Sequence, residues 1–86
     1  MTITQNENEL VNALVSGNRP LANKILTAVN GNSFSMTSFI DMILAECLIS
    51  PVTRAYQEAR DALNGTGMSQ DKAVLIVNDL KTYFGE

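Results

Sequence analysis

Apolar residues recur every three or four positions in five segments of the chain, and glycine or proline separates each segment from the next. This spacing is typical of amphipathic helices, and none of the segments shows the alternation expected of a strand. Short connections between the segments favour neighbouring helices that run antiparallel. The sequence therefore predicts an all-α fold, a compact bundle of four to five short helices that forms one domain over residues 1–86.

The first expected helix covers residues 6–16. Its start carries two alternative capping boxes, Thr4 with Glu7 or Asn6 with Glu9, in which the two side chains would satisfy free backbone N–H groups. Its predicted inner face consists of Leu10, Val11, Leu14 and Val15.

The second expected helix opens with Asn18, Arg19 and Pro20, because proline is tolerated where the backbone amide needs no partner. Gly17 before it and Gly31 after it are predicted helix ends, since glycine readily adopts the left-handed conformation found there. The predicted inner face consists of Leu21, Ala22, Ile25, Leu26 and Val29.

The third expected helix, residues 36–48, is apolar nearly all round, which is typical of a helix in the middle of a fold. Phe34 and Phe39 lie on either side of the expected cap Ser35, at the spacing of a hydrophobic staple. The sequence thus predicts an apolar central helix whose entry angle is set by two phenylalanines.

Asp41 and Glu46 are the only charged residues of that central helix. Five positions at about 100° each place them about 140° apart, so they cannot form one paired carboxylate site. We expect each to reach solvent or to pair with Arg or Lys from another helix, and their role is left open. Cys47 in the same helix is expected to be a small core residue, because no basic neighbour would stabilise a thiolate.

The last two helices begin at Ser50–Pro51 and at Ser69, each serine being an expected cap. Gly65 is expected to end the fourth helix. The predicted buried stripe of the fourth helix is Val52, Ala55, Tyr56, Ala59, Ala62 and Leu63. The fifth helix turns Ala73, Ile76, Val77, Leu80 and Phe84 inward, and Val74, Leu75 and Tyr83 widen its apolar stripe.

Residues 28–35, AVNGNSFS, and residues 62–69, ALNGTGMS, carry the same pattern 34 positions apart. In each, glycine follows Ala-x-Asn and a serine cap follows four residues later. A duplication would explain the pattern, and so would two independent uses of the commonest signals for a helix end and a helix start. The tetratricopeptide pattern of large and small positions is not met, so no family is assigned.

Composition removes several classes of function. The net charge is −3 and the six Lys and Arg are scattered, whereas a phosphate-binding surface needs clustered cations. Histidine is absent and there is one cysteine, so the commonest acid–base group is missing and no multi-thiolate metal site can form. We expect a cytoplasmic protein that does not enter the membrane, is not an enzyme, and needs no metal or cofactor.

One candidate recognition element is the segment around Ser50–Pro51 and the helix that follows. As a helix-turn-helix, it would offer Thr53, Arg54, Gln57 and Arg60 to the edges of DNA bases. The same residues also fit a solvated helix face, with Arg54 and Glu58 paired one turn apart. The acidic balance of the chain disfavours DNA binding.

The other candidate is an apolar surface on the last helix, made by Val74, Leu75, Tyr83 and Phe84. Met36, Met42 and Met68 would extend it, unless they are interior. The leading functional hypothesis is therefore a non-enzymatic protein-binding module, an adaptor, inhibitor or immunity-like protein. It would dock one helical face on another protein or on its own copy; a helix-turn-helix regulator is the alternative.

Overall fold

The computed structural model describes residues 1–46 and 51–86, and within them five α-helices and no strand occur. The all-α prediction is confirmed. The helices are α1, Glu7–Ser16; α2, Arg19–Asn30; α3, Met36–Ala45; α4, Pro51–Asp61; and α5, Gln70–Tyr83. A 3₁₀ turn, η1 (Thr4–Asn6), precedes α1, and a π-helical turn, η2 (Ala62–Thr66), follows α4. Cys47 and Ser50 lie outside the described residues.

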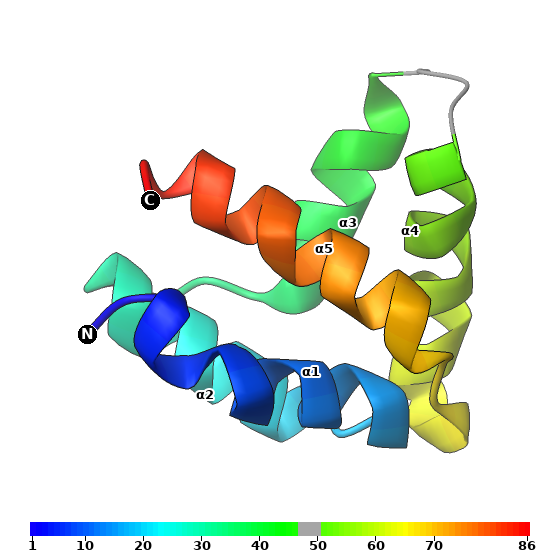
Figure 1. The fold of residues 1–86 in the computed structure, drawn as a ribbon, viewed down its shortest axis with the longest axis horizontal. Helices are drawn as coiled ribbons and strands as arrows, with labels where there is room; N and C mark the ends of the chain where they lie inside the picture. The colour runs from blue at the N-terminus through cyan, green and yellow to red at the C-terminus, as the bar shows by residue number, and fades with distance from the viewer. Residues whose placement is uncertain (47–50) are drawn as a thin grey trace.

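The helices form two antiparallel pairs with α5 between them (Figure 1). One pair is α1 with α2, and the other is α3 with α4, which stands across the first. Helix α5 contacts both α1 and α4, and so joins the two pairs into one core. The radius of gyration, 11.5 Å, is close to the value of about 12 Å expected for a compact chain of this length.

The core is made by the inner faces that the helical spacing predicts. Leu10 and Leu14 of α1 meet Ile76 and Leu80 of α5, all in one continuous cluster of buried residues. The small residues of α4 are buried, together with Tyr56. Small side chains let helices approach closely, so the alanines of this stripe suit the contacts of α4 with α3 and α5 and of η2 with α1. The alanines are Ala55, Ala59 and Ala62.

Two predictions for α1 are wrong. Val15 was expected inside but is exposed, because Ala13 and Leu14 complete the buried stripe before the helix ends at Gly17. Neither capping box forms, since α1 has no side-chain cap hydrogen bond. The Asn6 amide instead donates to the Thr2 carbonyl at 2.8 Å, and the Glu7 carboxylate pairs with Lys81 of α5 at 2.8 Å.

Helix α3 is buried only over its first half. Met36, Phe39 and Ile40 are buried, whereas residues 41–46 are exposed or half-buried. The prediction of an apolar central helix over 36–48 is therefore wrong for residues 41–46, and residues 47 and 48 lie outside the described residues. The end of the α3–α4 pair extends beyond α1, α2 and α5 (Figure 1).

The entry into α3 follows the prediction. The Ser35 side chain caps the helix by accepting the N–H of Ser38 at 3.0 Å. The rings of Phe34 and Phe39 have centroids 6.3 Å apart, as the hydrophobic staple requires. The second copy of the repeated pattern differs, because Gly65 lies inside η2 and Ser69 makes no side-chain cap hydrogen bond. The two stretches therefore share residues but not local structure.

The end of α1 packs backbone against backbone on η2. Gly17 has a φ of +71°, and a Cβ at this position would lie 2.5 Å from the carbonyl oxygen of Ala62. The Met68 N–H donates to the Val15 carbonyl at 3.3 Å. Arg19 at the start of α2 completes the junction, since its Nε donates to the Leu63 carbonyl at 3.3 Å. This corner fixes where α5 begins relative to α1.

Candidate functional site

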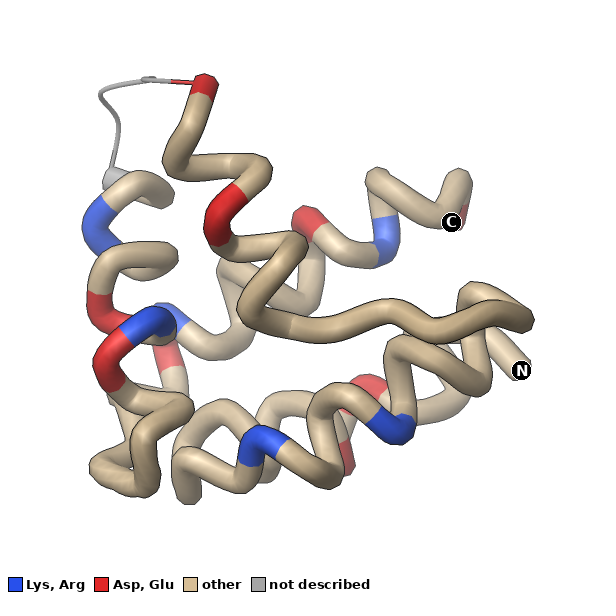
Figure 2. The backbone as a smooth tube through the Cα atoms, turned by 180° about the vertical axis from the view of Figure 1, so that it is seen from behind, with Lys and Arg blue, Asp and Glu red and all other residues tan. Residues whose placement is uncertain are grey.

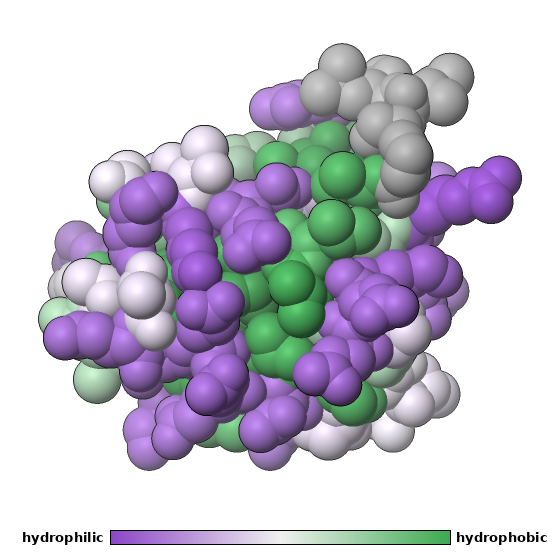
Figure 3. All heavy atoms as spheres, in the orientation of Figure 1, coloured by the Kyte–Doolittle hydropathy of each residue, from purple (hydrophilic) through white to green (hydrophobic). Residues whose placement is uncertain are grey.

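Several large apolar side chains remain exposed on the described part of the chain. Tyr83 is 50% exposed, Leu75 40%, Met42 39% and Val74 37%. Figure 3 shows an apolar area on the face where α5 crosses the molecule, continuing towards the α3–α4 pair. We call Val74 and Leu75, neighbours on α5, the apolar face, and Met42 is exposed on α3. Met36 and Met68 do not belong to it, because both are buried in the core.

The four partner-binding residues predicted at α5 do not lie on one side of the helix. Nine positions at about 100° each put Val74 and Tyr83 on opposite sides of the helix. Val74 shares its side with Lys81, which pairs with Glu7 of α1. Leu75 shares its side with Lys72, which pairs with Glu58 of α4 at 2.8 Å.

Tyr83 and Phe84 belong to an aromatic cluster instead. The ring of Tyr83 has its centroid 5.4 Å from that of Phe39 and 5.9 Å from that of Phe34. Phe84 lies 5.7 Å from Phe34 and is packed against the core. Tyr56 joins through Phe39 at 5.9 Å, so the cluster contains all three Phe and both Tyr of the chain. It links the C-terminal end of α5 to α3 and α4, which makes its main role structural.

A part-buried polar contact supports this cluster. The hydroxyl of Tyr56 donates to Oδ2 of Asp79 on α5 at 2.8 Å. Burial raises the pKa of Tyr56 well above its ordinary value, and the hydrogen bond and charge of Asp79 raise it further. The tyrosine therefore remains a neutral hydrogen-bond donor and cannot serve as a base near neutral pH.

Tyr56→Phe is expected to lower the free energy of unfolding by about 1–3 kcal/mol, because Asp79 loses its donor. Tyr83→Phe, at a half-exposed position, is the matched control and should change it by less than about 0.5 kcal/mol. Urea unfolding followed by circular dichroism measures both. Since the folded-state pKa is raised, the contribution of Tyr56 is present below about pH 10 and is lost as pH rises further. Equal stability of the two variants would contradict a structural role for the Tyr56–Asp79 contact.

The α4 residues proposed for DNA share one side of the helix, as their spacing predicts. Arg54, Gln57 and Arg60 are exposed and Thr53 is half-buried. Arg60 is 3.6 Å from Asp41 of α3, so part of its charge is neutralised. Seen from behind in Figure 2, Lys and Arg positions alternate with Asp and Glu along α4.

Helices α3 and α4 lie side by side and run in opposite directions (Figures 1 and 2). The turn that would join them as a helix-turn-helix falls on residues 47–50, outside the described residues. The expected ion pair between Arg54 and Glu58 is replaced by one between Glu58 and Lys72 of α5. The face therefore resembles a solvated helix surface with cross-helix ion pairs.

The acids of α3 behave as expected for surface charges. Asp41 and Glu46 are both exposed, and Asp41 pairs with Arg60. Within residues 1–46 and 51–86, no group of three or more metal-ligating side chains comes together. Over the same residues, no helix combines the length and the apolar character needed to cross a bilayer.

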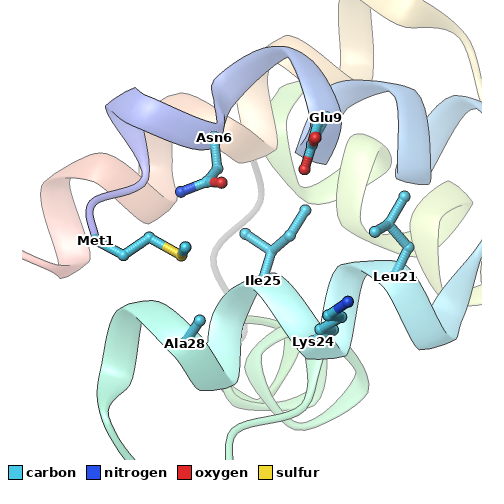
Figure 4. Close-up of a pocket in the computed structure, with 7 residues that line it drawn as sticks. All are labelled: Met1, Asn6, Glu9, Leu21, Lys24, Ile25 and Ala28. Atoms are coloured by element: carbon cyan, nitrogen blue, oxygen red, sulfur yellow. The ribbon is translucent and has the colours of Figure 1, made fainter.

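A cavity of about 320 Å³ lies between the N-terminal segment with α1 and helix α2 (Figure 4). Sequence analysis did not find it. Ile25 forms part of its apolar lining, while Glu9 and Lys24 bring one carboxylate and one ammonium group. Its volume is at the lower end of small-molecule sites, and one wall is Met1, which is 71% exposed. The full lining is Met1, Asn6, Glu9, Leu21, Lys24, Ile25 and Ala28.

The remaining feature that sequence analysis missed is Glu86. Its carboxylate accepts hydrogen bonds from the backbone N–H groups of Ile3 and Thr4, both at 2.8 Å. The hydroxyl of Thr4 donates to the same carboxylate at 2.8 Å. Gly85, two residues after the end of α5, was the available signal, because a glycine there redirects the next residue across the helix end.

Comparison with protein-family models, curated proteins and solved structures finds no match for this chain. Function must therefore be argued from the side chains themselves, and these present an exposed apolar face, an aromatic cluster and a carboxylate that joins the two ends of the fold.

Proposed function

We propose that this protein is a small binding module that docks a helix of another protein on its apolar face. The observation that carries this proposal is the exposure of Val74 and Leu75 on α5, in an apolar area of the surface (Figure 3), in a chain whose other large apolar residues mostly lie in the core. Contiguous apolar surface on a small soluble domain commonly marks an interaction site. An adaptor, an inhibitor and an immunity-like protein all act in this way.

Charge supports a basic partner. Asp71 is exposed on α5, one turn before Val74 and Leu75. The chain carries a net charge of −3. A partner helix with an apolar stripe flanked by Lys or Arg would cover Leu75 and Val74 and meet Asp71 with an opposite charge. The single cysteine suits a reducing compartment, so we place this encounter in the cytoplasm.

Photocrosslinking tests which face is used. p-Benzoylphenylalanine in place of Leu75 should crosslink one partner in native-host extract, and the crosslinked peptide should contain Lys or Arg near apolar residues. The same group in place of Gln57 is the control, because it is exposed on the α4 face. A crosslink from position 57 and none from position 75 would contradict the proposal. A crosslink to a second copy of this chain would replace the partner protein by a homodimer.

The affinity for the crosslinked segment, made as a synthetic peptide, gives a quantitative test. Burying a whole Leu or Val side chain contributes about 1.5–3 kcal/mol. Since Val74 and Leu75 still expose 37% and 40%, the double variant Val74→Ser/Leu75→Ser should weaken binding about tenfold. Arg54→Ser should leave the Kd unchanged. Weaker binding by Arg54→Ser, with an unchanged Kd for Val74→Ser/Leu75→Ser, would favour the α4 face and the DNA-binding alternative.

A further inference from the structure

The carboxylate of Glu86 bridges the two ends of the described fold. Ile3 and Thr4 stand at the start of η1, where backbone N–H groups have no partner within the helix. The Ile3 position has no side-chain cap of its own. Glu86 supplies the missing acceptor from the other end of the chain, through the bonds to Ile3 and Thr4 described above. Hydrogen bonds from N–H groups to a carboxylate are about twice as strong as bonds between neutral groups.

The local structure at the end of α5 aims this side chain. Gly85 adopts a φ of +77°, and its N–H donates to the Thr82 carbonyl at 3.1 Å. The N–H of Glu86 donates to the Lys81 carbonyl at 2.7 Å. These two bonds form a Schellman motif, the usual way of closing a helix with glycine. The backbone at the end of α5 therefore directs the Glu86 side chain towards the N-terminal segment.

The N-terminal segment, residues 1–6, contributes one residue to the core and part of the lining of the cavity. Ile3 is fully buried in the core although it lies outside the helices. Met1 and Asn6 form one side of the cavity whose other side is α2 (Figure 4). Ile3 and Thr4 lie between Met1 and Asn6 in the chain, and their hydrogen bonds to Glu86 hold them in place.

We propose that Glu86 is a latch, which holds residues 1–6 against the helices and whose release withdraws Ile3 from the core and opens the cavity beside α2. The hydrogen bonds of the latch depend on the negative charge of the Glu86 carboxylate, so protonation of the carboxyl group releases the latch. Lys81 of α5 is the charged group that acts on Glu86, and it pairs with Glu7 of α1.

The direction of the pH effect follows from the hydrogen bonds. The backbone N–H of Thr4 holds the pKa of Glu86 below its ordinary value, and the bonds from Ile3 and the Thr4 hydroxyl act in the same direction, as does the charge of Lys81. The latch therefore holds residues 1–6 in place above about pH 4.3, the ordinary pKa of glutamate. Its contribution is lost as pH falls through the lowered value.

Amide hydrogen exchange of the full chain, followed by NMR, tests the latch. In Glu86→Gln at pH 7, the protection factors of the Ile3 and Thr4 amides should fall about tenfold, the difference between a charged and a neutral acceptor. Amides inside α1, such as that of Leu14, should keep their protection. Glu9→Gln is the control, because it removes a carboxylate from the same end of the molecule and should change neither amide.

Acidification should lower the protection of the Ile3 and Thr4 amides only in the wild type, which has the Glu86 carboxyl group. In the wild type, protection of Ile3 and Thr4 should fall below about pH 4.3, together with the nuclear Overhauser contacts between Ile3 and the core. In Glu86→Gln, protection should already be low at pH 7 and change little on acidification. Wild-type protection in Glu86→Gln at pH 7 would overturn the latch. An equal loss at Leu14 would also overturn it, since the contact would then stabilise the whole fold.

Discussion

Gly17→Ala should lower the free energy of unfolding by about 2–5 kcal/mol. The left-handed conformation of Gly17 costs a residue with a Cβ about 1–2 kcal/mol. The added methyl group would lie 2.5 Å from the Ala62 carbonyl oxygen and 2.9 Å from the Gly67 nitrogen. Both are backbone atoms that cannot rotate away, and overpacking of this kind costs about 1–3 kcal/mol more.

Gly31→Ala is the matched control. Gly31 also ends a helix in the left-handed conformation, with a φ of +82°, but nothing lies within 4 Å of the position that its Cβ would occupy. This variant should lose only the conformational term, about 1–2 kcal/mol. Urea unfolding of both variants separates the two contributions. Equal losses would show that α1 does not pack on η2 as closely as described.

Phe39→Ala should lower the free energy of unfolding by about 3–5 kcal/mol, as is usual for a large buried aromatic residue. Phe39 is 1% exposed, and its ring contacts Phe34, Tyr56 and Tyr83. A typical domain is stable by only about 5–15 kcal/mol, so this one change removes a large share of the total. Thermal unfolding should show a fall in Tm of about 4–8 °C per kcal/mol.

Phe34→Ala is the control within the same cluster. Phe34 is half-buried, and it lies outside the helices on the connection from α2 to α3. Its loss should cost clearly less than the loss of Phe39, because less apolar surface returns to water. A larger loss at Phe34 than at Phe39 would contradict the position of Phe39 at the centre of the cluster.

Much of the local structure could be predicted from the sequence, because helical periodicity and the signals at helix ends act over a few residues. The buried stripe of α4 and the start of α5 after Ser69 are as predicted. The staple formed by Phe34 and Phe39 is also confirmed. The same reasoning could have separated Val74 from Tyr83, since nine helical positions place them on opposite sides.

The candidate site depended more on long-range contacts. Helix α3 is apolar along its length, yet only its first half is buried, because the other helices do not reach its second half. The α4 residues share one side as predicted, but the ion pairs that Arg60 and Glu58 make reach Asp41 of α3 and Lys72 of α5. Neither result depends on residues close in sequence.

The sequence by itself determined five amphipathic helices, their inner faces and most of their ends, because each depends on neighbours within one or two turns. Only the tertiary structure distinguished Gly17 from Gly31, two glycines with the same local role, by placing the backbone of η2 against one of them. It alone brought Glu86 to Ile3 and Thr4 from the other end of the chain. Contacts between residues so distant depend on how whole helices pack, and no local pattern encodes them.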